Sequence, residues 1–159
     1  MNLQGAITEE MTKFSCSNEA QLLAIGCQLG KLLKVGDVVT LSGDLGAGKT
    51  TLVRGLIQGI LPNEEVPSPT YTLVQSYDLP NFELWHCDLY RLKHPDEVFE
   101  LGLVDVLDDV VSLIEWPDKM GEHLPQNTLP VHIEFVKDGR DVIFGQAWSE
   151  RGLESIEHD

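Results

Sequence analysis

The spacing of apolar residues in the first half of the chain alternates between helix and strand periods. A helix is predicted over 18–33, because Asn18 suits an N-cap and apolar residues then recur every three or four positions. The β-branched run at 38–42 predicts a short strand. A second helix is predicted after residue 50, since positions 52, 53, 56, 57 and 60 are apolar. This half is therefore expected to run helix, strand, helix.

The second half has short apolar runs bounded by Pro, Gly, Asn and Asp, which predicts mainly strands. A short helix is expected from His94 to about Leu101, because Pro95 suits its first turn and Gly102 suits its end. The short apolar run at 110–114, which contains one serine, is typical of a buried parallel strand. The predicted strands are 71–77, 83–89, 110–114, 131–136 and 141–147.

These elements together predict an α/β sandwich with a central parallel sheet, antiparallel edge strands and flanking helices. We expect one domain over 1–159, with a core over about 10–147. The tail from Glu150 is polar and is expected to be frayed.

Composition indicates the cellular compartment in which the protein is expected. No apolar run approaches the roughly 18 residues that would span a membrane, so we expect no membrane segment. The first residues carry Glu9 and Glu10 and resemble neither a signal peptide nor a transit peptide. Cys16, Cys27 and Cys87 form no C-x-x-C pair, which favours reduced thiols in the cytoplasm.

The charge of the chain bears on its partners. Eleven Lys and Arg stand against 26 Asp and Glu, which gives a net charge of −15. Proteins that hold nucleic acid do so chiefly by neutralising phosphates with Lys and Arg. We therefore expect no strong direct binding to RNA or DNA, and an acidic surface suited to basic protein partners.

The octapeptide from Gly43 to Thr50 fits the pattern G-x-x-x-x-G-K-S/T, which cradles the phosphates of a nucleotide. A β-branched run precedes it and a helical pattern follows, which is the context the motif requires. Lys49 is expected to reach the β- and γ-phosphates, and the Thr50 hydroxyl to bind Mg²⁺. The fold expected is thus P-loop NTPase-like, with a nucleoside triphosphate and Mg²⁺ as cofactors. The expected nucleotide contacts here are Asp44, Leu45, Gly46, Ala47, Gly48, Lys49, Thr50 and Thr51.

Two acidic residues end predicted strands, where ligands gather in α/β sheets. Glu115 follows the apolar run at 110–114 and is expected to be a second Mg²⁺ ligand. Asp88 is expected to act on Mg²⁺ through water or to orient the attacking water as a base. The plainer alternatives are a solvent-facing Glu115 and an Asp88 that only caps a turn.

Several other residues carry weaker signals. Thr70 lies where switch NTPases place a residue that senses the γ-phosphate, although it also enters an edge strand. Arg91 suits either a phosphate contact or a salt bridge. Trp116 follows Glu115 and is kept near the nucleotide, although aromatic residues more often lie in cores. No metal-ligand spacing, and hence no role, is assigned to His86, His94, His123, His132 and His158.

Four segments, taken in order, resemble the TsaE (YjeE) family. They are 43–51, Ser-Pro-Thr-Tyr-Thr-Leu at 68–73, the H-x-D-L-Y-R-L segment at 86–92, and Leu-Ile-Glu-Trp at 113–116. The resemblance covers roughly residues 10–145. It implies a cytoplasmic ATPase that acts with the TsaB–TsaD heterodimer, alongside TsaC, in forming N6-threonylcarbamoyladenosine at position 37 of tRNAs reading codons that begin with A.

The resemblance also implies roles for individual residues. It places Mg²⁺ on Thr50 and Glu115 and makes Asp88 required for function. Lys49 and Trp116 fall on functional positions by the same matching. The nucleotide's base is implied to lie near Asn18, Glu19 and Gly139.

Three other functions fit a phosphate loop. A small-molecule kinase usually needs a lid with several arginines, whereas the arginines here are spread along the chain. A GTPase would carry an N-K-x-D stretch, which the sequence lacks. A regulatory module that docks partners when nucleotide is bound, with little turnover, stays open beside the ATPase.

Overall fold

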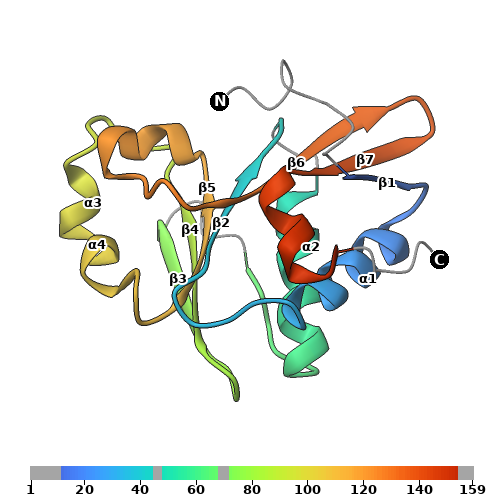
Figure 1. Cartoon of the computed structure of the whole chain (residues 1–159), viewed down its shortest axis with the longest axis horizontal. Helices are drawn as coiled ribbons and strands as arrows, with labels where there is room; N and C mark the ends of the chain where they lie inside the picture. Colours follow the sequence, from blue (N-terminus) through green and yellow to red (C-terminus); the bar gives the residue numbers. More distant parts are fainter. Residues whose placement is uncertain (1–11, 45–47, 68–71, 154–159) are drawn as a thin grey trace.

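The computed structural model describes residues 12–44, 48–67 and 72–153. Within these residues, seven strands form one sheet in the order β1-β7-β6-β2-β5-β4-β3 (Figure 1). The pairs β6–β2, β2–β5 and β5–β4 are parallel, whereas β1–β7, β7–β6 and β4–β3 are antiparallel. The predicted α/β arrangement, with a parallel centre and antiparallel edges, is therefore confirmed. The strands are β1 Thr12–Cys16, β2 Val38–Ser42, β3 Val74–Asp78, β4 Glu83–Asp88, β5 Val111–Glu115, β6 Leu129–Val136 and β7 Gly139–Phe144.

Helices cover both faces of the sheet, with α1 on one side and α3 and α4 on the other (Figure 1). Each face has its own apolar core, because alternate residues of a strand point to opposite faces. Leu113 of β5 packs in the core beneath α1 and α2, and its neighbour Ile114 packs in the core beneath α3 and η2. The helical segments are α1 Glu19–Gly30, α2 Lys49–Ile60, α3 Glu97–Glu100, α4 Leu103–Val106, η2 Pro117–His123 and η3 Gln146–Arg151.

Glycines bring α1 and α2 into backbone contact. A Cβ at Gly26 would overlap the backbone carbonyl of Leu52, and a Cβ at Gly55 would overlap the backbone of Leu23. Only glycine permits so close an approach. The start of α2 is therefore held against α1 as well as against the sheet.

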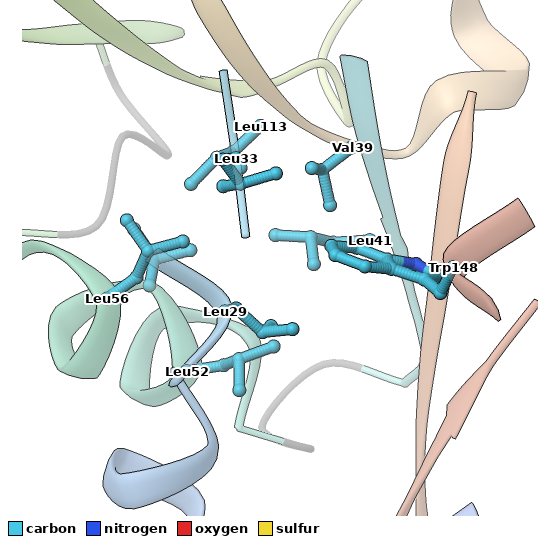
Figure 2. A pocket seen from close by; sticks show the side chains of 9 residues that line it. Leu29, Leu33, Val39, Leu41, Leu52, Leu56, Leu113 and Trp148 are labelled. Atoms are coloured by element: carbon cyan, nitrogen blue, oxygen red, sulfur yellow. The ribbon is translucent and has the colours of Figure 1, made fainter. Parts of the chain in front are cut away.

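Between these helices and β2 lies a small void of about 10 Å³ (Figure 2). Its walls are apolar, with Leu56 at the left and Trp148 at the right of the view. A buried water would need polar partners, which this lining does not offer. The void is thus a packing gap in the core and not a ligand site. Its lining is Leu29, Leu33, Val39, Leu41, Leu52, Val53, Leu56, Leu113 and Trp148.

The predicted helix over 94–101 is wrong in its extent. Two single-turn helices, α3 and α4, occupy this region and are separated by Gly102 at φ 76°. The expected stop at Gly102 is real, but the chain resumes a helical turn directly after it. The sequence pattern also missed β1, η2 and η3, which are short and depend on contacts with distant segments.

The expected fraying from Glu150 is wrong for the residues that can be described, which reach Leu153. Leu153 is 2% exposed, and Trp148 is fully buried against the sheet. Arg151 donates to both carboxylate oxygens of Asp37, in the turn before β2. The C-terminal turn is therefore anchored to the centre of the fold. Among the described residues, no helix has the length and apolar character required to cross a membrane.

Candidate functional site

The phosphate-loop motif lies between the end of β2 and the start of α2. Gly48, the N-cap of α2, has φ 116° and ψ 14°, and a Cβ there would lie 2.6 Å from Leu22 Cδ2. The positive φ favours glycine, and a Cβ would also displace the end of the Leu22 side chain. A glycine supplies no capping side chain, so the first-turn N–H groups of α2 are left to other acceptors. Such a helix start favours a bound anion such as phosphate.

Lys49 is buried at this helix start, with only 5% of its surface exposed. Its Nζ donates to the carbonyl oxygen of Gly43 over 2.9 Å. The same nitrogen lies 3.9 Å from Glu115 Oε1 and 4.7 Å from the ring centre of Trp116. The structure thus brings together three residues that the sequence predicted for the site.

Glu115 ends β5, the parallel neighbour of β2, with Leu41 as its register partner there. Its side chain is 6% exposed. Oε1 faces Lys49, and Oε2 lies 2.6 Å from His86 Nε2. The expectation of a strand-end carboxylate beside the loop agrees with this geometry, and the solvent-facing alternative does not.

Asp88 lies opposite Glu115 in the register between β4 and β5 and is also buried, at 5% exposure. Its Oδ1 accepts a hydrogen bond of 3.1 Å from the N–H of Tyr90, which closes the turn after β4. The turn-capping alternative is therefore real. A chemical role for Asp88 stays a prediction. It is supported by the position of Asp88, where the carboxyl ends of two parallel strands meet.

Trp116 has left-handed backbone angles, φ 60° and ψ 53°, which are uncommon outside glycine. They turn its ring over Lys49 and against Tyr90, whose ring centre lies 4.9 Å away. The indole Nε1 is buried, and no described residue accepts a hydrogen bond from it. A buried donor beside Lys49 fits a ligand that carries acceptor oxygens.

The donor set also fits Mg²⁺. Thr50 is partly buried in the first turn of α2, and Glu115 is on the neighbouring strand. Mg²⁺ prefers oxygen ligands and is usually held by one or two protein groups together with phosphate oxygens. In the described ranges, no three His, Cys, Asp or Glu side chains cluster in a way that could hold a metal.

The residues predicted for the base end of the nucleotide lie at the start of α1 and of β7. Asn18 Oδ1 caps α1 by accepting from the N–H of Gln21, and Glu19 lies 3.9 Å from Arg54 of α2. Gly139 packs against the backbone of Cys16. Asp44 is exposed and Thr51 is half-buried. Leu45, Gly46, Ala47 and Thr70 lie outside the described residues.

Cys87 points to the face of the sheet opposite that of its neighbours His86 and Asp88, and it is fully buried. Burial, reinforced by the charge of Glu115, raises the pKa of its thiol to about 12. The thiol therefore stays protonated at neutral pH and is unsuited to act as a nucleophile.

A profile described as "Threonylcarbamoyl adenosine biosynthesis protein TsaE" matches residues 16–142. The chain belongs to the TsaE family. This confirms the resemblance inferred from the four sequence segments. A TsaE protein of Haemophilus influenzae is 39% identical over 140 residues, covering 84% of this chain and 88% of that protein. One from a Nostoc species is 37% identical over 145 residues, covering 87% and 88%.

Both relatives are described as tRNA threonylcarbamoyladenosine biosynthesis proteins. A crystal structure of YdiB from Bacillus subtilis superposes with a TM-score of 0.72 at 32% identity, over 91% of this chain and 93% of that one. The TsaE-family chain described here thus shares its architecture with a solved protein over nearly its whole length.

Sequence reasoning missed one member of the site, His86, to which it assigned no role. In this TsaE-family chain its ring contacts Glu115 and its exposed fraction is 0%. The spacing supplied only part of the signal, since residues 86 and 88 are two apart and share one face of a strand. That Glu115 lies on this face follows from the pairing of β4 with β5.

Proposed function

We propose that this protein is a Mg²⁺-dependent ATPase required for the N6-threonylcarbamoyladenosine modification of tRNA, acting in the cytoplasm through the TsaB–TsaD complex and alongside TsaC. The observation that carries the proposal is the 3.9 Å approach of Lys49 Nζ to Glu115 Oε1 at the start of α2. A cation for phosphate and a carboxylate for Mg²⁺ thereby meet at one helix N-terminus. Family membership supplies the pathway.

The residues support a division of tasks within the site. Lys49 and the first-turn N–H groups of α2 would bind the phosphates, while Thr50 and Glu115 would hold Mg²⁺. When bound, Mg²⁺ neutralises the charge that develops on the transferred phosphoryl group. Asp88 would orient the attacking water from the neighbouring strand end. Trp116 would close over the phosphates, and Asn18, Glu19 and Gly139 would border the base.

The surface charge supports action through proteins. A net charge of −15 opposes a direct hold on tRNA, which is itself a polyanion. The protein is therefore proposed to bind protein partners and to use ATP binding or hydrolysis to reset them. Nothing in this scheme requires the chain to contact the tRNA.

The test is ATP hydrolysis with Mg²⁺, measured for the protein alone and with purified TsaB–TsaD. Lys49→Ala serves as the blank, and Lys93→Ala serves as the matched control because Lys93 is exposed and lies beyond β4. Stimulation by the heterodimer that is absent in Lys49→Ala supports the proposal. Binding to TsaB–TsaD that depends on ATP but brings no turnover favours the docking module instead. Turnover only with an added metabolite favours a kinase.

A further inference from the structure

We infer that His86 is a positioning residue, which holds the Glu115 carboxylate so that one of its oxygens faces Lys49 and the phosphate loop. The inference rests on the proposed function, since it concerns how the Mg²⁺ ligand is oriented. It adds a residue to which no role has been assigned. The side chains that carry it are His86, Glu115 and Lys49.

The two oxygens of Glu115 have different partners. His86 Nε2 lies 2.6 Å from Oε2, whereas Lys49 Nζ lies 3.9 Å from Oε1. A carboxylate oxygen only accepts, so Nε2 carries the hydrogen and donates it. The short contact fixes the plane of the carboxylate and leaves Oε1 directed at the loop.

The pairing of β4 with β5 places His86 and Glu115 within reach of each other. β4 and β5 are parallel, with His86 paired to Leu113 and Asp88 paired to Glu115. His86 and Glu115 are therefore diagonal neighbours on one face of the sheet, close enough for long side chains to meet. His86 is fully buried, and no described residue bonds its Nδ1. Within the described part of the chain, Glu115 is thus the polar partner of the His86 ring.

Lys49 explains why a positioning residue matters here. Without the hydrogen bond from His86, the carboxylate is free to rotate toward the ammonium group and close the 3.9 Å gap. A tight Lys49–Glu115 ion pair would occupy the cation needed for phosphate and the oxygen needed for Mg²⁺. Loss of an outer partner of a metal ligand commonly lowers metal affinity about 10- to 100-fold.

The test measures ADP binding by calorimetry in Mg²⁺ and in EDTA, so that the gain in affinity due to Mg²⁺ is obtained separately from turnover. His86→Leu removes the donor, whereas His86→Gln keeps a donor nitrogen at the same number of bonds from the backbone. Ser112→Ala is the matched control, since Ser112 is equally buried on β5 but faces the opposite side of the sheet. Thermal melting establishes that each variant is folded.

The expected result is a drop of about tenfold or more in the Mg²⁺-dependent gain for His86→Leu. Affinity in EDTA should not rise, and His86→Gln and Ser112→Ala should keep most of the gain. A folded His86→Leu with the wild-type gain overturns the inference. So does a folded His86→Gln that loses as much as His86→Leu.

If His86→Leu does not fold, His86→Phe replaces it in the same measurement, because it keeps a buried ring but lacks the donor nitrogen. A folded His86→Phe should lose about tenfold or more of the Mg²⁺-dependent gain, and one that keeps the wild-type gain overturns the inference. A wild-type protein with no Mg²⁺-dependent gain would instead overturn the proposed Mg²⁺ role, and the inference with it. Failure of the inference alone is therefore distinguishable.

Discussion

Asp88 and Glu115 lie directly opposite each other at the carboxyl ends of β4 and β5, and both are nearly inaccessible to solvent. Glu115 Oε1 lies 3.9 Å from Lys49 Nζ, and Asp88 Oδ1 accepts a hydrogen bond from the N–H of Tyr90. The two carboxylates therefore differ in their surroundings although they share a position in the sheet. We therefore expect different results when the charge of Asp88 or that of Glu115 is removed.

Glu115→Gln should abolish the Mg²⁺-dependent gain in nucleotide affinity and, with it, turnover. Asp88→Asn should lower turnover by about 100-fold or more, the usual loss of a general base, while it keeps the Mg²⁺-dependent gain. Calorimetry with ADP and a phosphate-release assay in the presence of the partners separate the two outcomes. If Asp88→Asn loses Mg²⁺ dependence as fully as Glu115→Gln, Asp88 belongs to the metal site.

Gly48→Ala should lower stability by about 2 kcal/mol or more and eliminate nucleotide binding, because the new methyl group meets Leu22 at a φ of 116°. Gly36→Ala is the matched control. Gly36 also has a positive φ, 94°, but a Cβ there comes no closer than 3.7 Å to the carbonyl oxygen of Asp108. It should cost about 1–2 kcal/mol and leave binding intact. Urea unfolding and ADP titration check both; equal effects would mean that the clash is unimportant.

Arg151→Ala should destabilise the protein by about 1–3 kcal/mol, because it leaves the buried Asp37 carboxylate with the N–H of Lys34 as its remaining partner among the described residues. Adding Asp37→Asn should recover part of the loss, since the uncompensated charge is removed. Urea unfolding of both variants gives the comparison. A loss below about 0.5 kcal/mol for Arg151→Ala would show that this ion pair behaves like a surface pair.

Cys87 should be unreactive toward iodoacetamide in the native protein at pH 8, whereas the partly exposed Cys27 should be alkylated. All three cysteines should react in denaturant, as peptide mass spectrometry would record. Labelling of native Cys87 at the rate of Cys27 would contradict the burial described here.

The raised pKa of Cys87 also predicts a pH dependence of stability. The unfolded thiol ionises from about pH 9, and the buried thiol ionises only near pH 12. The contribution of Cys87 to the free energy of unfolding is fully present below pH 9. It is lost as the pH rises toward 12, by about 1.4 kcal/mol per pH unit. Urea unfolding of wild type and Cys87→Ala from pH 8 to 11 isolates it, since the variant should show a smaller decline.

The sequence predicted the central elements because their signals are local. The loop motif with its flanking strand and helix predicts the position of Lys49. The rule that ligands bind at the carboxyl ends of parallel strands predicts that Glu115 lies beside it. The strand at 12–16 lacked such a signal, because it exists as an edge strand only through its pairing with β7. The contact between His86 and Glu115 joins diagonal positions on two strands 29 residues apart in sequence, so it depends on a strand pairing and register that no local pattern specifies.

The backbone contacts between α1 and α2 have a mechanical consequence. Glycines seat one helix on the other so closely that sliding between them would drive main-chain atoms into each other. Asn18 at the start of α1 and Gly48 at the start of α2 are therefore expected to move together. A displacement of α2 should therefore carry α1 with it, so that the proposed nucleotide site would bind or release the base and the phosphates in a single movement.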